Sequence, residues 1–297
     1  MFSLPECITW LAVGLMLSVA IVTLNLITVI VFIKNRNLRK RSTYLVINLA
    51  VVDMLTGGFA INAFFGTVGE TFCNLWKYSI HDKWARYTFY AIIHLFPVAS
   101  LTSITVIALE RLHATFKPIT HRELRTWIYQ FITLIIWATA GIVSSVDIVL
   151  LAYKERSHFG YLWNSFNSIC LLIICISYSA IVIKVRCGAH PRHHGAANKE
   201  RKLTMTLFIV TFVSLLVWLP YVISSFLYFT SDISSSLSTL AISRLNLTMV
   251  ALYHSNSLVN PILYTVLMPG FRRVVVALFR RRPQQQNQAP VIPLRDI

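Results

Sequence analysis

The sequence predicts an all-α membrane protein, a seven-transmembrane helix bundle with a short cytoplasmic amphipathic helix after the seventh span. Hydrophobic residues make up 56% of the 297 residues and charged residues only 13%, which is outside the usual range of soluble domains. Seven apolar segments reach the length of about 20 residues that a helix needs to cross a hydrocarbon core of about 30 Å. A membrane barrel would instead need strands of about 10 residues with alternating polarity, a pattern that is absent here.

Each predicted span rests on its length and on its small number of charged residues. Two spans carry one acid each, Asp53 and Asp147, and the other five carry no Asp, Glu, Lys or Arg. In chain order we expect the spans at residues 8–33, 42–69, 87–109, 126–153, 157–183, 203–231 and 245–269. The predicted organisation is a bundle at residues 1–271, an amphipathic helix at 270–282 and a disordered tail at 283–297.

The basic residues predict the orientation of the bundle. Of the 27 Lys and Arg residues, 21 follow the first, third, fifth and seventh spans, and six lie on the other face. Short cytoplasmic loops carry the excess of basic residues, so we expect the N-terminus outside and the C-terminus in the cytoplasm. The net charge of +16 therefore indicates contact with anionic inner-leaflet lipids and not with nucleic acid.

Two acids and two prolines stand out inside the spans. Unpaired charge in a bilayer is costly, so Asp53 and Asp147 are candidate functional residues. The alternative for Asp53 is a carboxyl group that serves packing, and Asp147 lies close enough to the outer end of its helix to reach water. Pro220 and Pro261 each free a backbone carbonyl within a helix, which makes a deformable point.

Three motifs give the sequence its resemblance to a known family. Glu110-Arg111-Leu112 ends the third span, Trp218-Leu219-Pro220 lies in the sixth, and Asn260-Pro261 with Tyr264 lies in the seventh. In this order they resemble the motifs of the rhodopsin-like, or class A, G-protein-coupled receptors. Further matching landmarks cover almost the whole chain: Asn25, Asp53, Pro118, Trp137, Tyr178 and Phe271-Arg272-Arg273.

The resemblance implies a plasma-membrane receptor that couples an extracellular small-molecule ligand to a heterotrimeric G protein. Arg111 would be held by Glu110 and by Glu200, at the base of the sixth span, until the sixth helix moves outward about Pro220. The alternative for Glu200 is a solvated charge. The other residues that the resemblance assigns to activation and coupling are Tyr178, Trp218, Pro261 and Tyr264.

The resemblance also implies a polar cluster that holds a sodium ion in this family. Its members here would be Asp53, Ser100, Asn256 and Asn260. Oxygen ligands suit a hard cation, and a cation would explain how a buried carboxylate stays charged. We expect no other metal and no retinal, because the seventh span contains no lysine and the retinal position is His254.

The usual disulfide of the family is missing. The position 25 residues before Arg111, where the family has a cysteine, is Arg86, and the loop between the fourth and fifth spans contains no Cys. Cys7 and Cys73 are the cysteines that remain on the predicted outer face. They leave two alternatives, a replacement bridge and two free thiols.

The expected ligand pocket indicates a small, weakly polar or lipid-like ligand. Ile93 occupies the position of the Asp that anchors amines in the family, which argues against a biogenic amine held there by a salt bridge. The pocket would be lined by Ile93, His94, Pro97, Trp218, Tyr221 and His254. The alternative for His94 and His254 is that they are hydrogen-bonded packing residues.

Other functions remain as alternatives. One is a receptor-like orphan or decoy without agonist-driven signalling. An intramembrane enzyme would need several His and carboxylate residues at metal-ligand spacing, and the spans lack such a set. A transporter would show internal repeats or broken helices with acids near the midplane. We therefore expect no enzyme activity.

Overall fold

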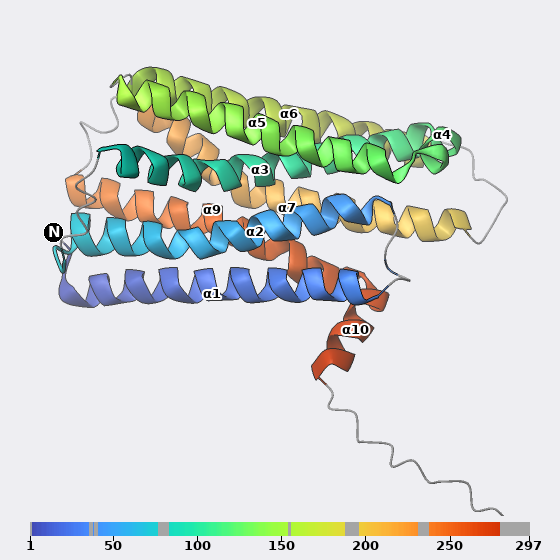
Figure 1. The fold of residues 1–297 in the computed structure, drawn as a ribbon, viewed down its shortest axis with the longest axis horizontal. Helices are drawn as coiled ribbons and strands as arrows, with labels where there is room; N and C mark the ends of the chain where they lie inside the picture. Colours follow the sequence, from blue (N-terminus) through green and yellow to red (C-terminus); the bar gives the residue numbers. More distant parts are fainter. Residues whose placement is uncertain are drawn as a thin grey trace, which may run out of the picture.

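The computed structural model describes residues 2–35, 38, 41–76, 83–153, 156–187, 196–230 and 238–279. Seven long helices in this part of the chain lie side by side along one axis and alternate in direction (Figure 1). We call the end that holds the first residues of α1 the amino-terminal end, and the other the opposite end. The expected tail at 283–297 lies outside the described residues.

The first three long helices follow the first three apolar segments. They are α1 (Leu4–Lys34), α2 (Thr43–Phe64) and α3 (Lys83–Phe116). A π-helical segment, η2 (Phe65–Phe72), continues α2 at the amino-terminal end. Pro97 lies inside α3, where neighbouring helices and polar side chains tolerate the missing amide donor.

The second half of the chain begins with the short helix α4 (Pro118–Glu123) at the opposite end of the bundle (Figure 1). The remaining helices are α5 (Thr126–Ala152), α6 (Arg156–Cys187), α7 (Ala196–Thr230), α9 (Thr239–Leu267) and α10 (Pro269–Phe279).

The lengths and composition of the helices fit a membrane protein. Within the described residues, α1, α2, α3, α5 and α6 each contain a segment that is long and apolar enough to cross a membrane. Helix α9 reaches this standard together with α10, across a bend of 100°, and α7 contains a shorter apolar stretch, Phe212–Leu227. The predicted fold class, an all-α bundle of seven helices with a short helix after the seventh, is confirmed.

Small residues let α1 and α2 pack closely. A Cβ atom on Gly14 would lie 2.5 Å from Cγ of Phe64, and one on Gly57 would lie 2.6 Å from Cγ2 of Ile21. Side chains at these positions would push the two helices apart, because helix association in lipid depends on close van der Waals packing. Helix α3 packs on α2, α5, α6 and α7, so it forms the centre of the bundle.

The helix α10 turns away from the bundle and anchors by one aromatic residue (Figure 1). The Phe271 side chain is fully buried, with ring centroids 5.3 Å from Phe32 and 6.1 Å from Tyr264. Arg272 and Arg273 are exposed. One apolar and one basic face suit a helix that lies along a membrane surface.

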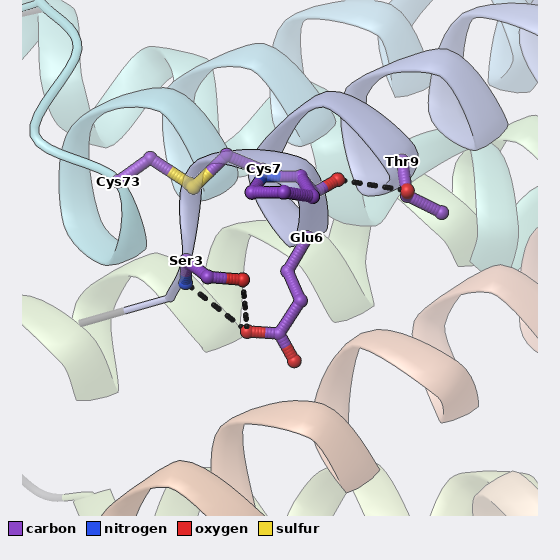
Figure 2. Close-up of a disulfide and its surroundings, with 6 residues drawn as sticks. Ser3, Glu6, Cys7, Thr9 and Cys73 are labelled. Atoms are coloured by element: carbon purple, nitrogen blue, oxygen red, sulfur yellow. Dashed lines mark hydrogen bonds between the residues drawn. A yellow bond between two sulfur atoms is a disulfide. The ribbon is translucent and has the colours of Figure 1, made fainter.

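A disulfide joins Cys7 and Cys73 at the amino-terminal end, so of the two alternatives the structure contains the bridge (Figure 2). Cys7 lies in the first turns of α1 and Cys73 directly follows η2. The Phe2 amide also donates to the Phe72 carbonyl at 3.2 Å, and the two rings lie 5.2 Å apart. Covalent and noncovalent contacts therefore fix the start of α1 to the end of η2.

We expect Cys73→Ser to lower the thermal unfolding midpoint of the purified protein. The bridge closes a long loop, with a sequence separation of 66 residues, and such bridges contribute about 2–4 kcal/mol. Cys7→Ser and the double variant should have the same effect as the single change, and Cys175→Ser, at an exposed free thiol, should have none. A double variant that is clearly less stable than either single variant would contradict the bridge.

Candidate functional site

The centre of the bundle contains a fully buried carboxylate that three donors hold. Asp53 of α2 accepts hydrogen bonds from Ser100 Oγ of α3 at 2.7 Å and from Ser257 Oγ of α9 at 3.0 Å. Its second oxygen accepts from Asn260 Nδ2 of α9 at 2.9 Å. Hydrogen bonds of this kind compensate for the lost hydration of a buried carboxylate. The group therefore ties three helices together at one point.

Asn25 extends this cluster to α1. Its amide nitrogen donates to the Ile21 carbonyl of its own helix at 3.0 Å and to the Ser257 carbonyl of α9 at 2.9 Å. The second bond satisfies a backbone acceptor four residues before Pro261, whose missing amide would otherwise leave that acceptor free. Asn25 thus stabilises the proline break in α9.

The structure brings together three of the four residues expected in the polar cluster, and adds Ser257. Asp53, Ser100 and Asn260 are bonded as described. Asn256 is also buried, but the hydrogen bonds of the described residues do not include one from Asn256 to Asp53. The Oδ1 atoms of Asn256 and Asn260 are both buried and accept no hydrogen bond within this part of the chain. These oxygens are available to a bound cation or to water.

At the opposite end, Arg111 forms a buried ion pair with its neighbour Glu110. The Arg111 Nε and Nη2 atoms contact Oε2 of Glu110. The other oxygen of Glu110 lies 2.7 Å from His121 Nε2 of α4 and 3.3 Å from the Tyr129 hydroxyl of α5. Arg111 is 3% exposed and Glu110 9%. The pair is therefore held inside a junction of α3, α4 and α5.

The sequence did not identify His121 and Tyr129 as part of this site. Their signal was weak, because they lie 10 and 18 residues after Arg111 on separate helices. The predicted partner Glu200 belongs to α7, but its side chain lies outside the described residues. The ion pair between Arg111 and Glu110 is the part of the predicted latch that the structure describes.

An aromatic cluster lies beside the proline break of α7. The Tyr253 ring of α9 lies 4.8 Å from the Trp218 ring and 4.7 Å from the Tyr221 ring. His254 stacks edge-on against Phe64 at 5.8 Å, and its Nδ1 lies 2.8 Å from the Val250 carbonyl. The Tyr253 ring also lies 5.2 Å from His254, so it links the predicted pocket residues Trp218, Tyr221 and His254.

The other predicted pocket residues belong to α3. Pro97 is buried and Ile93 is half-buried. His94 faces α5 and α6, with its ring 5.2 Å from Trp163 and its Nδ1 3.9 Å from Asp147 Oδ2. The two predicted histidines therefore have different surroundings, His94 beside a carboxylate and His254 beside a backbone carbonyl.

The remaining predicted switch residues lie between helices near the opposite end. Tyr178 of α6 packs edge-on against Phe208 of α7 at 5.4 Å. Tyr264 of α9 packs edge-on against Phe32 of α1 at 6.3 Å. Pro220 and Pro261 both lie inside their helices, as expected. Both tyrosines are buried, Tyr178 at the interface of α6 with α7 and Tyr264 where α9 meets α1 and α10.

Comparisons with known proteins identify the family. The model of the "7 transmembrane receptor (rhodopsin family)" matches residues 24–264, which include every motif described above except the start of α10. The chain is 27% identical to the blue-sensitive opsin of Anolis carolinensis, over 85% of this chain and 75% of the opsin. It is 25% identical to the histamine H2 receptor of Canis lupus familiaris, over 85% of this chain and 74% of that receptor.

The human substance-P receptor is 24% identical, over 94% of this chain and 72% of the receptor. The names of these relatives refer to blue light, histamine and substance P, so the comparisons identify a family and no ligand. The family and these relatives are receptors and not enzymes. The chain belongs to the rhodopsin family of seven-transmembrane receptors, multi-pass proteins of the plasma membrane that signal through G proteins.

Proposed function

We propose that this receptor binds a small, weakly polar or lipid-like extracellular ligand and activates a G protein by outward movement of α7 and release of Arg111. The observation that carries the mechanism is the buried ion pair between Arg111 and Glu110 at the opposite end of the bundle. A buried arginine that is held by one adjacent carboxylate can be released. The contact would form in the closed state of this end and break in the open state. Glu200, on α7, would complete the latch.

The ligand would reach the aromatic cluster at α7 and α9. Trp218 lies two residues before Pro220, so a ligand that displaces its ring acts at the deformable point of α7. The expected lining, Ile93, Pro97, Tyr221 and His254 included, is mostly apolar, which favours a weakly polar ligand. Helix α7 would then swing about Pro220 and separate from α3 at the opposite end.

The charges support one orientation of this bundle. We propose that the amino-terminal end faces outward and the opposite end the cytoplasm, because 21 of the 27 basic residues follow the first, third, fifth and seventh spans in the sequence. The exposed Arg272 and Arg273 of α10 would contact anionic inner-leaflet lipids there. The same basic rim would surround the cavity that opens for the G protein.

We further propose that sodium binds beside Asp53 in the inactive state. Asn256 and Asn260 each offer a buried oxygen without a donor, and Asp53 supplies the negative charge. A small set of oxygen ligands with one carboxylate suits a hard monovalent cation. These residues would hold the ion, and its charge would stabilise the ionised form of Asp53.

Guanine-nucleotide exchange on a panel of Gα proteins tests the coupling mechanism. Arg111→Ala should lower exchange about tenfold or more, because the freed guanidinium would otherwise make charged hydrogen bonds with the G protein. Arg125→Ala, at an exposed residue of the same end, removes the same charge and should have little effect. Equal exchange by the wild type and Arg111→Ala would remove the signalling proposal.

The latch predicts a gain of basal exchange when its acid is neutralised. Glu110→Gln should raise exchange without ligand by a few fold to about tenfold, because the ion pair favours the closed state only by the energy of its charged contacts. Glu123→Gln, at an exposed acid of α4, is the matched control. Charge reversal at Glu200 should also raise basal exchange, and no change would remove Glu200 from the latch.

Sodium binding predicts ion-specific stabilisation. Replacing KCl by NaCl at constant ionic strength should raise the thermal midpoint of the purified receptor, because an ion that binds only the folded state stabilises it. Asp53→Asn should abolish this difference, and Asp147→Asn, at the other buried acid, should retain it. A sodium effect that survives Asp53→Asn would contradict the assignment.

A further inference from the structure

A second buried carboxylate lies near the amino-terminal end without the donors that Asp53 has. Asp147 of α5 is 2% exposed, and neither of its oxygens accepts a hydrogen bond from the described residues. His94 of α3 can carry a positive charge, but its Nδ1 lies 3.9 Å from Asp147 Oδ2, which is too far for a hydrogen bond. A buried carboxylate in this condition is costly unless a donor or a cation reaches it.

Other buried side-chain oxygens of α5 and α6 also lack a hydrogen-bond donor within the described residues. Ser144 precedes Asp147 by three residues, so the two share a face of α5, and its Oγ is unbonded within the described residues. Asn164 and Asn167 are likewise three residues apart on α6, and both have a buried Oδ1 without a donor. The Asn167 Nδ2 atom donates a hydrogen bond to the Trp163 carbonyl at 2.7 Å. We call Ser144, Asp147, Asn164 and Asn167 the acceptor cluster.

His94 of α3 lies against both helices that carry the acceptor cluster. His94 contacts Asp147 of α5, and its ring lies 5.2 Å from Trp163, which directly precedes Asn164. Helix α6 packs on both α3 and α5, and His94 contacts a residue of each of the two helices that carry the acceptor cluster. The His94 side chain is 26% exposed, whereas that of Asp147 is 2% exposed and lies five residues before the end of α5.

We propose that the acceptor cluster binds the ammonium group of the receptor's ligand. All the unbonded atoms are oxygens that accept hydrogen bonds, and one carboxylate supplies a negative charge, so the matching group is a cation with several N–H donors. The rings of Trp163 and His94 provide an aromatic wall, and the indole adds attraction for a cation. The family's amine position on α3 is Ile93, and here the carboxylate comes from α5.

This inference rests on the proposed small-molecule ligand and selects its lipid-like form, an apolar molecule with one charged group. The ligand has a largely apolar body that reaches toward Trp218 and one basic nitrogen at the acceptor cluster. The same cluster of oxygens would also suit a metal cation. The experiment therefore compares the two sources of positive charge.

Binding is measured as a shift in the thermal midpoint of the purified full-length receptor, without a G protein, so its outcome is independent of the exchange assay. The probes are phenylalkylamines of increasing chain length, each paired with the phenylalkanol of the same length. The amines are ammonium ions at neutral pH. We expect stabilisation by at least one amine and none by its alcohol. The apparent dissociation constant of that amine should be about ten- to a hundredfold higher for Asp147→Asn.

Matched variants separate a binding role from a structural one. Ser144→Ala should weaken amine binding, while Ser145→Ala, at the exposed neighbouring serine, should leave it unchanged. Without any probe, Asp147→Asn should keep or raise the thermal midpoint, because it removes a buried charge that lacks donors.

Three results would overturn the proposal. One is the absence of an Asp147-dependent amine shift across the series. The second is a lower midpoint of unliganded Asp147→Asn, which would indicate that the carboxylate serves packing. The third is Asp147-dependent stabilisation by NaCl or CaCl2 with no such effect of the amines, which would make this a metal-ion site.

Discussion

The buried carboxylate of Asp53 is the constraint on which the centre of the bundle depends. A charge in hydrocarbon must find donors within the protein, and here they come from α3 and α9, while Asn25 of α1 adds a bond to the carbonyl of Ser257. Four helices must therefore keep one register at this point. Apolar packing alone would fix that register less well, since the lipid is as apolar as the side chains. The proline break in α9 lies directly beside this fixed point, because Asn260, which binds Asp53, precedes Pro261.

The two ends of the bundle are held by different means. At the amino-terminal end, the Cys7–Cys73 bridge joins α1 to the end of η2, and Arg244 of α9 reaches Glu6 of α1 at 2.5 Å. At the opposite end, the buried contacts of Glu110 with Arg111 and His121 are polar and reversible. A covalent tie and a breakable ion pair give the bundle one end that resists change and one that permits it. This asymmetry would suit the proposed transmission from a ligand at one end to a partner at the other.

The sequence predicted the parts of the molecule whose signal is local. Apolar runs of about 25 residues identified the helices, and the Asp53, Arg111, Pro220 and Pro261 motifs identified the polar centre and the breaks. Contacts between distant segments were not predictable, and these include Ser257 on Asp53, the acceptor cluster, and His121 and Tyr129 around Glu110. Each of these residues is an ordinary polar or aromatic residue whose role depends on which helix faces it. The Cys7–Cys73 bridge stayed one of two alternatives for the same reason, because it depends on the distance between two helix ends.

The position of the disulfide determines which helices have covalent support and which do not. The family's usual disulfide would tie α3 to the loop between α5 and α6, and here the tie lies at α1 and η2 instead. The acceptor cluster between α3, α5 and α6 thus lacks that covalent support, and within the described residues its contacts are the noncovalent ones of His94 with Asp147 and Trp163. A ligand that bonds to Asp147 and to Asn164 or Asn167 would itself link α5 to α6. If these helices lie closer together in the active state, such a ligand would bind that state more tightly. It would then shift the equilibrium between the two states of the bundle, because a ligand does so only by its different affinity for them.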